Sequence, residues 1–409
     1  MFKLFSILLF ISLLPSCFVS VEQVEALIAL FRHGARKPMK NFANLPNYPD
    51  EIEEIKDLTL MGIRRQFNLG QMLRSNYPDL FPKTFTYHSM NITASETKRT
   101  ITSAMSQIQG IFRGRNGFNI DTPENPINFS PQWNGDQAEP GFQGDSGLPN
   151  GMVLAPIFSF NENTNFLFKA DQTCDLIKEE TDNSFQSESE SLFLSLQDAY
   201  QIFKKNKFSI QEVYGKPEME DSFEKFGEIS DALTCILFRD PQNRLDNFSF
   251  SQQAHMIFVN SLYIYSRFSR NSMRKYYLTP LLNEWIDILE GLTHLVPENN
   301  SLQAVINDIE FSKIQLFYGH QENISALLLE LFDEFATTKI VQQYDKFKDQ
   351  ANLIENQGQY DDFLKAIIED YPITHLEFGS NLIFELVSND NIGIKHFFSN
   401  IKMIQLKLE

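Results

Sequence analysis

A buried strand that runs directly into a basic loop constrains this 409-residue chain more than any other feature. The strand is the apolar run 26–31, whose composition is typical of a strand covered on both faces in an α/β sheet. The loop is 32–38 (R-H-G-A-R-K-P), and it starts at the carboxyl end of the strand, where α/β sheets bind ligands. The segment therefore predicts both an α/β fold and the position of its binding site.

Two arginines flank one histidine in this loop, and that combination suits an oxyanion. The planar guanidinium groups of Arg32 and Arg36 keep their charge and can each bind two phosphate oxygens. Among these three side chains, the imidazole of His33 is the group that can act as a nucleophile. The loop therefore predicts a phosphate site with an attacking group inside it.

Two later segments place basic side chains at element boundaries comparable to that of the loop 32–38. A T-x-x-E pattern at 93–96 predicts a capping box, and the helix that it opens carries Arg99 near its first turn, where a helix favours anions. The apolar strand that ends at Tyr318 is followed by Gly319 and by His320, which begins a leucine-rich helix. We therefore expect Arg99 and His320 beside the first loop.

The pattern R-H-G-x-R-x-P resembles the signature of the histidine acid phosphatase family, within the wider histidine phosphatase (phosphoglycerate mutase-like) superfamily, at every fixed position. Segment 95–104 resembles the R-T-x-x-S-A element of that family, and 378–386 resembles its strand with the ending F-E-L. The resemblance implies an α/β fold, with a phosphoglycerate mutase-like mixed sheet flanked by helices and a smaller, mostly helical inserted domain. It also implies that His33 is the nucleophile and that Arg32, Arg36, Arg99 and His320 hold phosphate.

The second histidine motif departs from the family pattern. Most members follow this histidine with an aspartate that protonates the leaving group, whereas this chain has Gln321, and an amide cannot act as an acid. Glu322 is one position further, as in the H-A-E motif of the multiple inositol polyphosphate phosphatases, so we expect Glu322 to be the proton donor. A surface glutamate and an enzyme slowed by loss of its acid are the alternatives.

Local patterns predict several further elements. A helix with N-cap Thr59 is expected over 60–74, with its core face at Leu60, Ile63, Phe67 and Leu73. The alternation over 84–89 predicts a strand, and 278–289 predicts a helix.

The domain boundaries follow changes in composition. Residues 1–20 have the lysine and apolar stretch of a secretory signal peptide, and no later apolar run is long enough for a membrane span in the mature chain. We expect an α/β catalytic domain of 21–127 and 271–409, and a mostly helical insertion of 128–270 that caps the site. The two cysteines of the mature chain, Cys174 and Cys235, could pair or stay free.

The net charge and the motifs of the chain limit the classes of partner and cofactor that it can bind. The net charge of −18 argues against nucleic acid, although a local arginine cluster can still bind a small phosphate ester. The sequence contains no metal-ligand spacing, and the implied reaction needs no cofactor. The signal peptide and the sequons at Asn91, Asn128, Asn247 and Asn299 indicate the secretory pathway and an extracellular or lysosomal glycoprotein, while the sequon at Asn323 is expected to be too enclosed for modification.

The sequence as a whole predicts an acid phosphatase that hydrolyses small-molecule phosphate monoesters through a phosphohistidine. An acidic optimum is expected because a carboxylic acid donor must be protonated to act. A catalytically impaired phosphate-ester binding protein, an inositol-phosphate phosphatase, and a mutase or phosphatase for a soluble metabolite stay open. The sequence indicates no oligomeric state.

Overall fold

The structure is a computed structural model of the chain. It describes residues 24–45, 56–113, 152–239, 249–294, 312–331, 344, 347–356, 358–360, 362–363, 378–387, 391–398 and 401–407. The predicted signal peptide and the sequons at Asn128, Asn247 and Asn299 lie outside the described residues. Within the described part, no helix is both long and apolar enough to span a bilayer.

One seven-stranded mixed sheet organises the fold, in the order β3-β2-β4-β1-β5-β6-β7. The pairs from β3 to β1 are parallel, and those from β1 to β7 are antiparallel. The strands are β1 (Val24–Arg32), β2 (Asn91–Ala94), β3 (Phe158–Ser159), β4 (Ile314–Gly319), β5 (Asn381–Val387), β6 (Asn391–Phe398) and β7 (Ile401–Lys407). The predicted mixed sheet flanked by helices is confirmed.

β1 is buried on both faces, which explains its unbroken apolar sequence. Because successive side chains of a strand point to opposite faces, Ala26, Ile28 and Leu30 pack into one hydrophobic cluster. Leu27, Ala29 and Phe31 pack into the other. The strand that carries the basic loop is thus anchored from both sides.

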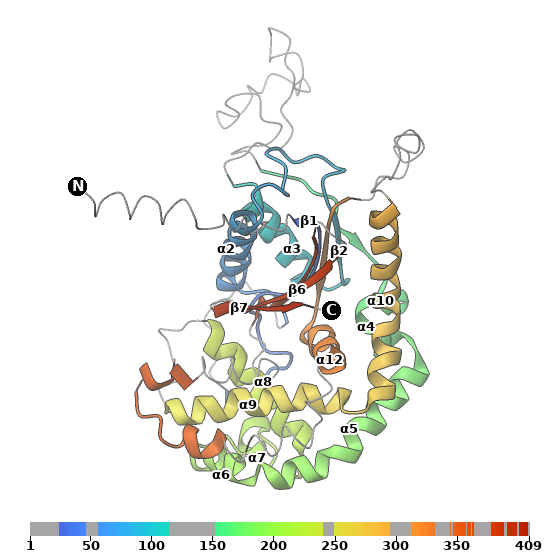
Figure 1. The fold of residues 1–409 in the computed structure, drawn as a ribbon. Coiled ribbons are helices and arrows are strands. Elements are labelled where there is room, and N and C mark those ends of the chain that lie inside the picture. The colour runs from blue at the N-terminus through green and yellow to red at the C-terminus, as the bar shows by residue number, and fades with distance from the viewer. Residues whose placement is uncertain are drawn as a thin grey trace, which may run out of the picture.

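Helices α2 (Leu60–Asn76) and α3 (Lys98–Ile111) cover one face of the sheet together (Figure 1). They pack closely because Gly70 and Gly110 each lie against backbone of the other helix, where a Cβ atom would overlap it. Thr59 is the predicted N-cap of α2, and its side chain accepts from the Gly62 amide.

The remaining helices are those from the middle of the chain and α12; Figure 1 shows α8, α9 and α12 on the side of the sheet opposite to α2 and α3. They are η3 (Glu162–Thr164), α4 (Phe166–Thr173), α5 (Asp175–Ser195), α6 (Gln197–Lys205), α7 (Ile210–Tyr214), α8 (Phe223–Arg239), α9 (Phe250–Tyr265), η4 (Ser266–Phe268), α10 (Asn271–His294) and α12 (Gln321–Leu331). α10 contains the predicted helix 278–289. The division into domains at residues 128 and 270 stays a proposal.

Three local predictions are wrong. Residues 84–89 form a turn, in which the Ser89 amide donates to the Thr86 carbonyl, and not a strand. Thr93 lies in β2 and caps no helix, because pairing with β4 takes this segment into the sheet, and α3 begins at Lys98. The buried face of α2 is also shifted: Leu60 is 64% exposed, while Gln66 is fully buried.

Candidate active site

The three predicted phosphate-binding segments meet at one edge of the sheet. β4 lies between β1 and β2, and its last residue, Gly319, pairs with Arg32, the last residue of β1. Because these strands are parallel, their carboxyl ends lie side by side. His33 and His320 are therefore adjacent, with ring centroids 5.6 Å apart, although they lie far apart in the sequence.

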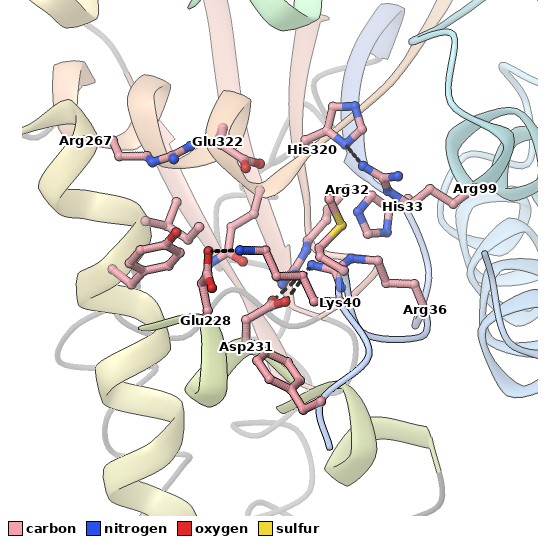
Figure 2. Close-up of a pocket in the computed structure, with 15 residues that line it drawn as sticks. Arg32, His33, Arg36, Lys40, Arg99, Glu228, Asp231, Arg267, His320 and Glu322 are labelled. Carbon is pink, nitrogen blue, oxygen red and sulfur yellow. Dashed lines mark hydrogen bonds and ion pairs between the residues drawn. The ribbon is translucent and has the colours of Figure 1, made fainter. Parts of the chain in front are cut away.

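A cavity of about 230 Å³ opens at this edge, far larger than the ~10–15 Å³ that holds one water. Figure 2 shows its main side chains. Its lining includes all six predicted site residues: Arg32, His33, Arg36, Arg99, His320 and Glu322. The structure thus brings every one of them to a single site.

The contacts of His33 define which of its nitrogens can react. Nδ1 lies 2.9 Å from the carbonyl oxygen of Gly34, and a carbonyl can only accept, so Nδ1 carries the proton. Nε2 then holds the lone pair. Burial lowers the pKa of His33 well below its usual value, and the neighbouring Arg99 and His320 add to that effect. The ring is therefore neutral and nucleophilic.

The loop around His33 is held in place by contacts from two helices. The Gly34 amide donates to Oγ of Ser103 on α3 at 3.0 Å, and Gln66 of α2 donates to the Arg32 carbonyl at 3.3 Å. A Cβ atom on Gly34 would come within 2.8 Å of the Gly62 carbonyl oxygen, so only glycine fits this approach. These contacts explain why the glycine of the motif is needed.

His320 contacts a donor and a hydroxyl. A guanidinium can only donate, so Arg99 Nη2, 3.3 Å away, makes Nδ1 of His320 an acceptor. Nε2 then donates to Oγ of Ser95 at 2.8 Å. Burial, with Arg99 nearby, lowers the pKa of His320 well below its usual value, so this ring is also neutral.

The cavity collects positive charge on its arginines. Burial lowers the pKa of Arg32 to about 10, with Arg36 as a second cause, and the same two causes lower the pKa of Arg99 to about 10. Both side chains still carry a full charge in acid and at neutral pH. Arg32 also lies over the ring of Phe378, 4.1 Å from its centroid, which fixes it by a cation–π contact.

Arg36 is bound by α8 rather than left open to the cavity. Its Nη2 donates to both carboxylate oxygens of Asp231, at 3.0 and 3.1 Å, and its Nη1 donates to Sγ of Cys235 at 3.2 Å. Cys174 and Cys235 are both free thiols, and burial raises the pKa of Cys235 to about 12.

The residues after His320 differ in exposure. Gln321 is buried and Glu322 is half-buried, and both line the cavity at the start of α12. The half-buried carboxylic acid of Glu322 thus lies in the site. Asn323 is fully buried, and its Oδ1 accepts from the His320 amide, which agrees with the enclosure expected for its sequon.

Sequence reasoning missed three polar residues at this site: Ser95, Asp231 and Arg267. Ser95 follows the end of β2, so the rule that located the two histidines could have found it. Asp231 on α8 and Arg267 on η4 line the cavity from the middle of the chain. No sequence motif around either residue predicts a place in the site. Among the described residues, no group of three His, Cys, Asp or Glu side chains could hold a metal ion.

Comparisons with known proteins agree with this geometry. The sequence profile described as "Histidine phosphatase superfamily (branch 2)" matches residues 23–399. Prostatic acid phosphatase of Bos taurus is 28% identical over 130 residues, which make up 30% of this chain and 33% of that relative. The match thus spans a third of the length of this curated relative.

Two solved structures share the fold. A phytase from Klebsiella sp. ASR1 has a TM-score of 0.56 at 15% identity, with 91% of this chain and 81% of that chain covered. The apo form of Hafnia alvei phytase has a TM-score of 0.54 at 14% identity, with 91% and 84% covered. At such identities the likeness is one of fold.

Proposed function

The chain belongs to branch 2 of the histidine phosphatase superfamily, and from this membership we propose that it hydrolyses phosphate monoesters through a phosphohistidine intermediate. The observation that carries the proposal is the state of His33. Its neutral ring keeps the Nε2 lone pair, in a cavity lined by Arg32, Arg99 and His320. A nucleophile beside a cluster of cations suits attack on a phosphoryl group.

The first step transfers the phosphoryl group to the protein. Nε2 of His33 forms a bond to phosphorus while the bond between phosphorus and the ester oxygen breaks. Glu322 gives its proton to the departing oxygen, so an alcohol leaves and Glu322 becomes a carboxylate. Arg32, Arg36, Arg99 and His320 stabilise the charge on the three remaining phosphoryl oxygens.

The second step returns the enzyme to its starting state. Water attacks phosphorus, the bond to Nε2 breaks, and the carboxylate of Glu322 takes a proton from the water. The lowered pKa of His33 supports action below the pH at which an ordinary imidazole is protonated, because this ring stays neutral and nucleophilic there.

We propose that the protein acts in the secretory pathway, as an extracellular or lysosomal acid phosphatase. The apolar amino-terminal segment 1–20 and the sequons support this location. We also propose that residues 128–270 form an insertion that caps the site. Asp231 and Arg267, which line the cavity from this region, support that role.

A catalytically impaired binding protein is the second candidate, because Gln321 stands where most members have the acid. An inositol-phosphate phosphatase is the third. It is supported by the H-Q-E motif and by Arg267, which lies beside Glu322 in the cavity lining (Figure 2) and could contact a further phosphate.

Release of phosphate from an aryl phosphate, measured against pH, tests the proposal. We expect activity in wild type and its loss in His33→Ala, while the exposed His88→Ala serves as the matched histidine control and keeps activity. Calorimetric titration of inorganic phosphate separates the candidates. Binding without turnover in wild type supports the binding protein, and turnover that survives in His33→Ala contradicts the phosphohistidine mechanism.

A further inference from the structure

Helix α8 presents acceptors to the loop that follows β1. Asp231 and Cys235 are four residues apart, so they lie on one face of the helix, one turn from each other. Both contact the guanidinium of Arg36. Glu228 lies one turn before Asp231 and forms a second ion pair, at 2.6 Å, with Lys40, which lies two residues beyond the loop 32–38. Helix α8 thus binds two cationic side chains, Arg36 and Lys40, of the segment that follows β1.

The terminal nitrogens of Arg36 are fully used by the protein. Nη2 donates to both oxygens of Asp231, while Nη1 donates to Cys235 and, at 3.0 Å, to the carbonyl of Lys37. Both terminal nitrogens of the guanidinium are thus engaged by the protein. Nε is buried and has no hydrogen-bond partner among the described residues. Arg36 is therefore less available to phosphate than a guanidinium that is open to the cavity.

The ion pair also reduces the field of Arg36 in the cavity. The side chains of Arg36 and Asp231 are only 8% and 15% exposed, so water screens their interaction weakly. Burial opposes the charge of Arg36, yet the Asp231 carboxylate raises its pKa above the usual value. Asp231 itself lines the cavity, so its negative charge lies beside the place where a phosphate dianion would bind.

Arg99 provides the contrast to Arg36. It donates to a neutral acceptor, Nδ1 of His320, and its Nε has no hydrogen-bond partner among the described residues. The two arginines are therefore not equivalent: the charge of Arg99 meets a neutral ring, whereas that of Arg36 is paired with a carboxylate.

We propose that Asp231 is a competing counter-ion that holds Arg36 and thereby lowers the affinity of the cavity for phosphate. This inference rests on the phosphate site of the proposed function. It assigns to Asp231, which lies outside the sequence motifs, an effect on the affinity of the site for its product, inorganic phosphate. Because inorganic phosphate is both product and ligand of the same cradle, Asp231 favours its release.

Titration of inorganic phosphate into Asp231→Asn tests the charge of this residue. Asparagine keeps the size of the side chain and removes the carboxylate, so phosphate should bind at least about tenfold more tightly than in wild type. Asp231→Glu keeps the negative charge, so its affinity for phosphate should stay within about threefold of wild type. Loss of fold alone would weaken phosphate binding, so a gain in affinity is not the result of a structural defect.

A double variant tests whether Asp231 acts through Arg36. In an Arg36→Met background, the Asp231→Asn substitution should raise phosphate affinity clearly less than it does in wild type, because only the direct repulsion by the carboxylate is then removed. If the full gain persists there, Asp231 repels phosphate directly and the role of Arg36 is wrong. Asp221→Asn is the matched control, because Asp221 pairs with Lys204 in the same helical region and is not among the residues that line the cavity.

Thermal unfolding gives a second measurement on the same proteins. Asp231→Asn leaves a buried cation without its counter-ion, so the ligand-free variant should have a lower Tm, and saturating phosphate should raise its Tm more than that of wild type. Unchanged or weaker phosphate binding in folded Asp231→Asn overturns the inference and leaves the proposed function intact. Wild type that binds no phosphate overturns both.

Discussion

The hydroxyl oxygen of Ser95 lies 2.8 Å from Nε2 of His320, at the side of the ring that faces away from Arg99. In the ligand-free site Nε2 donates and Ser95 accepts. To donate to a phosphoryl oxygen, Nδ1 of His320 needs a proton. A hydroxyl can both donate and accept, so Ser95 can reverse its bond and stabilise the other tautomer.

Replacement of Ser95 should therefore impair the reaction without removing any group from the cavity lining. We expect Ser95→Ala to lower kcat/KM by about tenfold, the cost of one lost hydrogen bond to a buried group. Ser95→Thr keeps the hydroxyl and should recover part of the loss. Steady-state kinetics on an aryl phosphate measures both, and equal activity of Ser95→Ala and wild type contradicts the tautomer role.

The assignment of Glu322 as proton donor predicts a dependence on the leaving group. Glu322→Gln should lose most of its activity on alkyl phosphates, whose leaving groups need a proton, and less on aryl phosphates with acidic leaving groups. Gln321→Asp restores the family acid and should retain or raise activity on alkyl esters. If Glu322→Gln hydrolyses poor leaving groups at the wild-type rate, the donor is another group.

The two buried histidines predict a loss of stability in acid. In the unfolded chain each ring titrates near pH 6.5, whereas in the folded protein burial keeps His33 and His320 neutral well below that pH. Below pH 6.5 the unfolded chain thus binds more protons, so the free energy of unfolding falls as pH falls, by up to about 1.4 kcal/mol per pH unit for each ring.

Denaturant unfolding between about pH 7.5 and 5.5 checks this slope, with those limits chosen as about one unit either side of an ordinary imidazole pKa. His33→Asn and His320→Asn should each show a shallower dependence than wild type. Asp171 acts in the opposite direction, because burial, with Glu322 as a second cause, raises its pKa to about 6. Identical slopes in wild type and both variants would rule out buried neutral histidines.

Close packing of Gly62 on the catalytic loop predicts intolerance of a methyl group. A Cβ atom there would overlap the backbone of Ala35, two residues after His33, and neither backbone can move freely. We expect Gly62→Ala to lower the free energy of unfolding by about 1–3 kcal/mol and to reduce phosphate binding. Gly358→Ala, where the nearest atom is 3.5 Å away, is the matched control and should show neither change.

The parts of the site that the sequence predicted share one property. His33 and His320 each follow an apolar strand, so local pattern alone gives their position at the carboxyl edge of the sheet. Arg99 was predicted from a helix start, which the structure places a few residues later, at Lys98. Glu322 was placed by motif resemblance, and the cavity contains it. Short-range signals sufficed for these residues because the strands themselves carry them to the site.

The parts that the sequence did not predict depend on long-range packing. Asp231 contacts Arg36 only because α8 packs against the loop, and nothing near residue 231 encodes that contact. The same effect explains the wrong capping box: Thr93 satisfies a local helix signal, but pairing with Phe317 in β4 draws it into the sheet. For Thr93, tertiary contacts thus outweighed the local propensity. For Asp231, the contact is itself a tertiary one.

The insertion of β4 between β1 and β2 has a consequence for how the chain matures. Both sheet partners of β1, β4 and β5, come from beyond residue 313, so a ribosome must finish most of the chain before the first strand can be paired. Pairings of such sequence separation form slowly and leave strand edges open to wrong partners meanwhile. The nascent protein should therefore depend on chaperones until the last quarter of the chain emerges. Acquisition of phosphate binding during refolding would report the moment at which β4 enters the sheet.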